Sequence, residues 1–220
     1  MNHCIVSPLS PPPARVTFYD LGARIYDWIV AFRLYHQWMW AIAPEEHTAF
    51  ARRALDAAAD GPILDAGCGS ALFTAPCYRE SRQPLTLLDA SVGMLARARR
   101  RLGSRDATWV KADLRALPFE AEQFANVFHF GVLHCIDEAP LVLSELARVL
   151  RPGGKLFLSC LTLARPRGDA FLRRLQRSSH VALPRHPQQV LAAVQHAGFT
   201  LRAHHQRGSF LFIEAELERA

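Results

Sequence analysis

Two glycines in the first half of the chain follow an apolar run and an acidic residue, a pattern that could bind a nucleotide-like ligand. The run I-L-D-A-G-C-G-S-A places Asp65 just before Gly67 and Gly69. Glycine lets the backbone turn tightly and approach a ligand without a Cβ in the way. A helix that follows such a turn directs its N-terminus towards the ligand. We therefore expect a ligand to contact the backbone at these glycines.

Three carboxylates narrow the choice of ligand. Asp65 suits a ligand that carries an ammonium group and would repel a pyrophosphate. Asp89 and Asp113 end the next two apolar runs, where they could accept hydrogen bonds from ribose hydroxyls and from the exocyclic amine of adenine. The dinucleotide spacing G-x-G-x-x-G is absent because Leu72 stands at the third position. This pattern disfavours an NAD-binding oxidoreductase.

These residues need an α/β sheet to bring them together. From Gly61 onward, short apolar runs alternate with helical stretches, which predicts a mostly parallel sheet covered on both faces. Ser91 is the predicted N-cap of one helix. Near the C-terminus, Gln206-Arg207-Gly208 separates two strands, as in a hairpin. The expected strands are residues 62–65, 85–89, 107–110, 127–130, 155–159, 200–205 and 209–215, with helices at 91–101, 141–150 and 188–197.

The predicted fold is a three-layer, doubly wound α/β domain with a mostly parallel seven-stranded sheet, closed by a C-terminal antiparallel hairpin. Residues 1–16, which contain a proline run, are expected to form a flexible leader, and residues 17–60 an N-terminal helical cap with helices at 19–32 and 45–59. Residues 61–220 form the ligand-binding domain. Within it, residues 161–187 are expected to be an insertion over the active site.

Bulk composition excludes several classes of protein. With 220 residues, of which 50% are hydrophobic and 21% charged, the chain fits one globular domain. The most apolar helical stretch, residues 28–43, is interrupted by Arg33, His36 and Gln37, and no secretion signal is visible, so a cytoplasmic location is expected. Five cysteines without a C-x-x-C pair predict neither disulfides nor a metal site.

The net charge of +6 could attract an anionic partner. The arginines are spread along the chain except on the predicted helix at 91–101, so nucleic-acid binding is not expected. A membrane surface is allowed as a partner but not required, and the sequence leaves the oligomeric state open.

Five sequence blocks, in order, resemble those of the class I S-adenosylmethionine-dependent methyltransferases. The resemblance is closest to the branch that contains the quinone-biosynthesis and small-molecule methyltransferases. Two positions depart from the family pattern: Ala71 replaces its third glycine, and Ala125 replaces an aspartate. The blocks are the glycine run, L-L-D-A-S-x-x-M-L at Leu87–Leu95, A-D-L-x-x-L-P-F at Ala112–Phe119, F-x-x-V-x-x-x-x-V-L-H at Phe124–His134 and L-R-P-G-G-K-L at Leu150–Leu156.

The resemblance implies S-adenosylmethionine as cofactor and assigns residues to each part of it. The glycine run would hold the methionine end, and the residues after the next two strands would hold the ribose and the adenine. In full, the implied cofactor residues are Asp65, Gly67, Cys68 and Gly69 for the methionine end, Asp89 for the ribose, Ser91, Met94, Asp113 and Leu114 for the adenine, and His129 and Phe130 beside the methionine portion.

Candidate catalytic and substrate residues lie outside the glycine run. His129 and His134 could act as a general base or orient a substrate hydroxyl, since histidine titrates near neutral pH, or they could simply be packing residues. Tyr19 and Tyr26, with the nearby tryptophans, could form an aromatic lid over the substrate. The alternative is a helix that packs its apolar stripe on the core.

The sequence therefore predicts transfer of a methyl group to an O, N or C atom of a small, aromatic or apolar acceptor. Methylation of a membrane quinone or lipid is one alternative. An NAD-binding oxidoreductase and a non-catalytic S-adenosylmethionine-binding domain are others.

Overall fold

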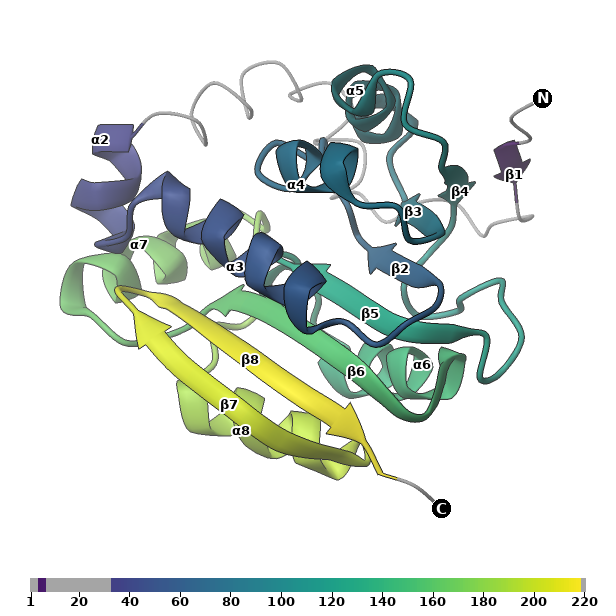
Figure 1. The fold of residues 1–220 in the computed structure, drawn as a ribbon. Helices are drawn as coiled ribbons and strands as arrows, with labels where there is room; N and C mark the ends of the chain where they lie inside the picture. Colours follow the sequence, from purple (N-terminus) through teal and green to yellow (C-terminus); the bar gives the residue numbers. More distant parts are fainter. Residues whose placement is uncertain (1–3, 7–32, 219–220) are drawn as a thin grey trace.

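The computed structural model describes residues 4–6 and 33–218, which form an eight-stranded sheet with helices on both faces (Figure 1). The spatial order of the strands is β1-β4-β3-β2-β5-β6-β8-β7. β8 runs antiparallel to β6 and β7, and the other neighbouring strands pair in parallel. The strands are β1 (Cys4–Val6), β2 (Ile63–Ala66), β3 (Leu85–Asp89), β4 (Thr108–Lys111), β5 (Phe124–Phe130), β6 (Leu150–Leu161), β7 (Phe199–Arg207) and β8 (Phe210–Leu217).

This architecture confirms the predicted doubly wound α/β fold and its C-terminal hairpin. The sheet has one strand more than predicted, because β1 pairs in parallel with Trp109–Lys111 of β4. β1 lies within residues 1–16, for which a flexible leader was expected; the apolar triplet Cys4-Ile5-Val6 instead extends the sheet edge. The remaining residues of that leader, apart from 4–6, and the helix expected at 19–32 lie outside the described residues.

Local sequence signals explain where the helices begin. Ser91 caps α5, accepting a hydrogen bond from the backbone N–H of Met94 at 3.1 Å, which confirms the predicted N-cap. Proline in the first turn starts five other helices, where its missing N–H costs nothing. The helices are α2 (Arg33–Tyr35), the π-helix η1 (His36–Trp40), α3 (Pro44–Ala57), α4 (Ala75–Glu80), α5 (Val92–Leu102), the 3₁₀-helix η2 (Leu133–Cys135), α6 (Ala139–Val149), α7 (Pro166–Arg177) and α8 (Pro187–His196).

Alternating side chains of the central strands build two cores. Leu64 and Val127 face α6 and α8, whereas Leu87, Phe128 and Phe157 face α3, α4 and α5. Figure 1 shows α3 and α6 on opposite sides of the sheet. Within residues 4–6 and 33–218, no helix is both long and apolar enough to cross a lipid bilayer.

The segment after β6 packs against a segment from near the N-terminus. The ring of Trp40 in η1 lies 5.6 Å from that of Phe171 in α7, measured between centroids. The turn between β7 and β8 fastens η1 to the sheet, because Ser209 N donates to Trp40 O at 2.8 Å. Residues 161–187 were expected to be an insertion. They contain α7, which contacts η1 beside the carboxyl end of β6.

Gly208 should be indispensable for this junction. It has a φ of +56°, and a Cβ at this position would collide with the backbone oxygens of Trp40 and Ala41. We expect Gly208→Ala to lower the free energy of unfolding by clearly more than Gly198→Ala. Gly198 also has a positive φ (+90°), but a Cβ there would make only an ordinary contact with Leu217, so its cost should stay at about 1–2 kcal/mol. Urea denaturation of both variants measures the difference, and equal losses would show that the junction does not need the glycine.

Candidate active site

The glycine turn follows β2, which lies where the order of the strands reverses: β3 and β4 follow on one side of it and β5 and β6 on the other. β2 pairs with β3 on one side and with β5 on the other, which makes its carboxyl end a topological switch point. The N–H groups of Gly67 and Cys68 both donate to Leu88 O, at 2.8 and 2.9 Å. Positive φ angles of 83° at Gly67 and 52° at Gly69 complete the turn.

Asp89, at the end of β3, holds the turn in place. Its Oδ2 accepts a hydrogen bond from Gly69 N at 2.8 Å, and its Oδ1 accepts one from Ser91 N at 2.9 Å. One carboxylate thus joins the glycine turn to the start of α5. A carboxylate oxygen can accept more than one hydrogen bond, as binding to a ligand's hydroxyl groups would require.

The backbone of the turn is open on one side. Among the described residues, a Cβ built on Gly69 would have no neighbour within 4 Å, and the same holds for Gly131 after β5. Gly67 is closed by comparison, since a Cβ there would lie 2.9 Å from Val132 Cγ2 and 3.4 Å from Leu114 Cδ1. Space for a ligand therefore adjoins Gly69 and Gly131, whereas Leu114 and Val132 close the position at Gly67.

Ala71 occupies the place of the family's third glycine in a conformation that favours glycine. It is buried and has a φ of 52°. A left-handed residue with a Cβ costs about 1–2 kcal/mol, and the surrounding structure must offset that cost. The sequence indicated only that a small residue replaces the glycine, whereas the structure shows that the backbone keeps the glycine conformation.

Asp65 is a buried carboxyl group with one unused oxygen. Tyr78 Oη in α4 donates to Asp65 Oδ2 at 2.8 Å, while Oδ1 has no hydrogen-bond partner among the described residues. Burial raises the pKa of Asp65 to about 7; the bond from Tyr78 opposes the rise, and the charge of Asp89 adds to it. Such a group is poised to accept a hydrogen bond from a positively charged ligand.

Asp113 is already engaged by a neighbouring arginine. Arg115 donates to Asp113 Oδ2 from Nη2 at 2.6 Å, and its Nε lies 3.0 Å from Oδ1. Burial alone would raise the pKa of Asp113, but the hydrogen bonds from Arg115 outweigh it and the pKa is lowered. The predicted adenine contact would have to share this carboxylate with a guanidinium that the sequence reasoning did not consider.

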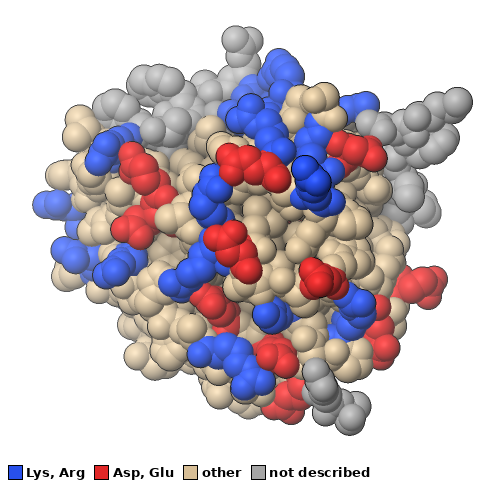
Figure 2. All heavy atoms as spheres, viewed as in Figure 1, with Lys and Arg blue, Asp and Glu red and all other residues tan. Residues whose placement is uncertain are grey.

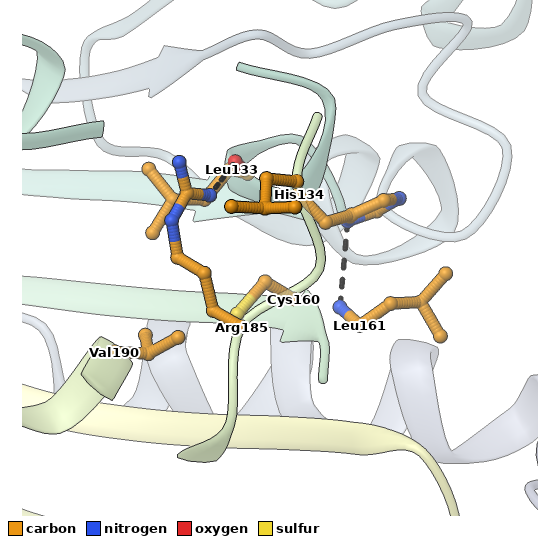
Figure 3. Close-up of a pocket in the computed structure, with 7 residues that line it drawn as sticks. Leu133, His134, Cys160, Leu161, Arg185 and Val190 are labelled. Carbon is orange, nitrogen blue, oxygen red and sulfur yellow. Dashed lines mark hydrogen bonds between the residues drawn. The ribbon is translucent and has the colours of Figure 1, made fainter. Parts of the chain in front are cut away.

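The two histidines are held as opposite tautomers. His129 is fully buried, and its Nδ1 lies 2.7 Å from Ala66 O, which accepts only from an N–H, so Nε2 is left with a lone pair and no described partner. For His134 the backbone N–H of Leu161 donates to Nδ1 at 3.4 Å, which places the proton on Nε2 (Figure 3). Burial lowers the pKa of each to about 4, so both are neutral at pH 7.

The small cavity beside His134 is a structural junction. Arg185 donates to the backbone oxygens of Leu133, Ile136 and Asp137, at 3.3, 2.8 and 2.8 Å, and so ties residues 161–187 to the loop after β5 (Figure 3). The enclosed volume is about 10 Å³, enough for roughly one water molecule. Burial raises the pKa of the adjacent Cys160 thiol to about 12, which leaves it unreactive.

The structure gathers many of the predicted cofactor residues around one turn. Those on or next to the turn are Asp65, Gly67, Cys68, Gly69, Asp89, Ser91 and Met94, with Leu114 beside Gly67. Tyr19 and Tyr26, predicted to contact the substrate, lie outside the described residues. Sequence reasoning missed Tyr78, Arg115 and Val132. A polar residue in the helix that follows the glycine turn could have indicated Tyr78, but no local signal pointed to the other two.

These residues fit the cofactor that the sequence implies. The orphaned Asp65 Oδ1 suits the ammonium of a methionine end, and the open backbone at Gly69 admits close approach. The described residues contain no cluster of His, Cys, Asp and Glu side chains that could hold a metal ion.

Comparison with known proteins assigns the central part of the chain to a family. Residues 64–158, from β2 into β6, match the family described as "Methyltransferase domain". These residues form a methyltransferase domain. The match starts one residue before Asp65 and includes every cofactor position predicted from the sequence.

Curated relatives of the methyltransferase domain include O- and C-methyltransferases. The chain is 33% identical over 124 residues to malonyl-acyl-carrier-protein O-methyltransferase of Enterobacter lignolyticus, covering 53% of this chain and 48% of that protein. It is 34% identical over 96 residues to ubiquinone/menaquinone biosynthesis C-methyltransferase UbiE of Desulfotalea psychrophila, covering 43% and 39%. The chain thus spans less than half the length of these relatives.

Solved structures share the fold over nearly the whole chain. The 4+2 cyclase SpnF superposes with a TM-score of 0.73 at 15% identity, covering 96% of this chain and 99% of that one. The methyltransferase domain and its flanking elements therefore have the class I methyltransferase fold.

The variant Gly69→Ala should distinguish the loss of space for a ligand from strain in the backbone. A Cβ at Gly69 meets no protein atom, and Ala71 shows that this turn accepts alanine at a φ of 52°. We expect the variant to fold with a modest loss in melting temperature, consistent with about 1–2 kcal/mol, but to bind S-adenosylhomocysteine at least tenfold more weakly. Calorimetry measures the affinity. Unchanged binding would mean that the cofactor does not approach this backbone.

Proposed function

We propose that the chain transfers the methyl group of S-adenosylmethionine to a small-molecule acceptor. The observation that carries this proposal is the buried, unpartnered Asp65 Oδ1 beside a glycine turn whose backbone is open at Gly69. This combination suits a ligand with an ammonium at one end and hydroxyls that can reach Asp89. The methyltransferase domain match over residues 64–158 supports the same conclusion.

In the proposed reaction, the cofactor supplies an activated methyl group, and the chain's residues bind, orient and exclude water. Asp65 would hold the ammonium and Asp89 the ribose diol. Gly69 and Gly131 would provide the surface against which the cofactor lies. Leu114 and Val132 would supply apolar walls.

The histidines support an acceptor that needs little help to lose a proton. His134 has its proton on Nε2 and can donate a hydrogen bond there but cannot accept one. His129 has a free Nε2 lone pair, but with a pKa of about 4 it is a weak base. We therefore favour acceptors that are already anionic at neutral pH, such as carboxylates or acidic phenols and enols. A carboxylate acceptor is consistent with the O-methyltransferase relative.

A non-catalytic role for the same site is the second candidate, because a fold does not by itself imply a function. A turnover assay distinguishes the two candidates, since S-adenosylhomocysteine must appear in stoichiometry with methylated product. A panel of carboxylates, phenols, quinols, amines and lipids tests the acceptor class. Binding of the cofactor without turnover on any member would favour the non-catalytic role.

A cytoplasmic location remains a prediction. Cys68, Cys77, Cys135 and Cys160 are free thiols, which suits a reducing compartment. Fractionation of cells that express the tagged chain would test it.

Replacing Asp89 tests the ribose assignment. Asp89→Ala removes two charge-assisted acceptors, each worth roughly 1.5–3 kcal/mol, so S-adenosylhomocysteine affinity should fall at least tenfold. Because Asp89 also holds Gly69 N and Ser91 N, part of the loss will come from a loosened turn. Asp106→Ala, an equal change of charge at an exposed position, is the control. Equal calorimetric affinities of the two variants would contradict the assignment.

Cofactor binding should release a proton from Asp65. With its pKa near 7 in the folded protein, Asp65 is largely protonated at pH 6, and a ligand ammonium would favour the ionised form. We expect release of close to one proton per bound S-adenosylhomocysteine at pH 6 and much less at pH 8, measured by calorimetry in buffers of different ionisation enthalpy. Proton release that does not depend on pH would exclude Asp65 as the ammonium partner.

The same raised pKa has a consequence for stability without ligand. Because the folded-state pKa exceeds the unfolded value, the contribution of Asp65 to the free energy of unfolding is fully present below about pH 4. It is lost as the pH rises towards 7. Asp65→Asn should remove this decline, which makes the pH dependence of its unfolding between pH 4 and 7 a control for the binding experiment.

A further inference from the structure

Helix α7 carries a face of unpaired arginines at the carboxyl edge of the sheet. Arg167, Arg173, Arg174 and Arg177 are all exposed, and their helical spacing places them on the side opposite the buried Leu172. In the part of the chain that the structure describes, none of the four forms an ion pair. Figure 2 shows basic side chains at the left margin, where α2 and α7 lie in Figure 1.

The single acidic residue of α7 does not neutralise this face. Asp169 Oδ1 accepts hydrogen bonds from the backbone N–H groups of Ala164 and Arg165, at 2.9 and 3.0 Å. Its carboxylate is thus directed to the start of the helix. Several arginines elsewhere are engaged within the fold: Arg148, for example, donates to Glu145 and to the backbone oxygens of Leu117 and Phe119.

Two large exposed apolar side chains lie on α2 and η1, and one of them contacts α7. Leu34 and Trp38, four residues apart in α2 and η1, are 64% and 62% exposed. The guanidinium of Arg167 lies 4.6 Å from the centroid of the Trp38 ring, which makes the apolar and basic groups one continuous surface. A hollow of about 430 Å³ between η1 and α7 is lined in part by Trp38, Met39, Arg165 and Arg167.

We propose that this surface, formed by α7, Leu34 and Trp38, docks the protein on an anionic lipid bilayer. The negative surface of such a bilayer attracts arginines, and its interface accepts an indole ring and a leucine side chain. The hollow beside Arg165 and Arg167 has room for a lipid phosphate. A nucleic acid would also bind arginines, but an exposed leucine would gain nothing from it. The combination of apolar and basic groups therefore favours the bilayer.

The docking surface lies next to the candidate active site. The ring of His36 in η1 is 6.0 Å from that of Phe73, which follows the glycine turn, so η1 adjoins the cofactor edge. A docked molecule would hold that edge near the bilayer, within reach of a lipid-soluble acceptor. The docking itself does not depend on the proposed methyl transfer, and the binding measurements below require no activity.

Vesicle binding by the full chain tests the docking. We expect co-sedimentation with vesicles of 70% phosphatidylcholine and 30% phosphatidylglycerol, weak binding to pure phosphatidylcholine, and loss of binding when NaCl is raised from about 0.1 to 0.5 M. The triple variant Arg173→Gln, Arg174→Gln, Arg177→Gln should bind roughly a hundredfold more weakly, at about fivefold for each arginine. Trp38→Ala should also weaken binding at about 0.1 M NaCl.

A variant with the same loss of charge elsewhere is the control. Arg79→Gln, Arg99→Gln, Arg100→Gln removes three exposed arginines from α4 and α5 and should change vesicle binding by less than about threefold. Circular dichroism of each variant establishes that it is folded. Equal effects of the two triple variants, or no binding of the unaltered chain, would overturn the proposal. Binding of single-stranded RNA as tight as that of anionic vesicles, lost in the α7 variant, would reassign the surface to nucleic acid.

Discussion

The carboxylate of Asp89 is the interaction on which the candidate site depends. It accepts from Gly69 N in the turn after β2 and from Ser91 N at the start of α5, so one side chain fixes the ends of two neighbouring strands relative to each other. Backbone bonds add to this constraint, since the N–H groups of Gly67 and Cys68 both donate to Leu88 O and Ala71 N donates to Cys68 O. The open backbone at Gly69 can therefore face a ligand without collapsing onto the protein.

Some buried polar atoms of the described residues have hydrogen-bond partners, whereas others, at the switch point and elsewhere, have none. Asn126 in β5 is fully buried and exchanges two hydrogen bonds with the backbone of Ala59, at 2.9 and 2.8 Å, which anchors the chain before β2. Asp65 and His129 are equally buried, yet each keeps one atom without a described partner. Leaving such a group unpaired costs about 1–3 kcal/mol, so its persistence at the switch point favours a ligand that completes the bonding.

The arginines show a similar division. Many hold loops together by donating to backbone oxygens: Arg185 fastens the segment after β6 to the loop after β5, and Arg105 donates to the backbone oxygens of Tyr78 and Gln83. Such bonds use the N–H groups of the guanidinium within the fold and leave few of them to bind a partner. Among the described residues, the exposed arginines of α7 form no such bonds. The net charge counts both kinds of arginine alike, so it could not indicate the proposed docking surface.

The sequence by itself determined the order of the elements and the position of the ligand-binding edge. Apolar runs such as Leu85–Asp89 and the glycine turn are local signals, since strand burial and positive φ depend on residue type and spacing. Tertiary structure alone decided what the polar groups contact. Tyr78 meets Asp65, and Leu161 N meets His134, across distances along the chain that no local pattern encodes. The addition of β1 to the edge likewise required the exposed N–H and C=O groups of β4, which exist only once the sheet has formed.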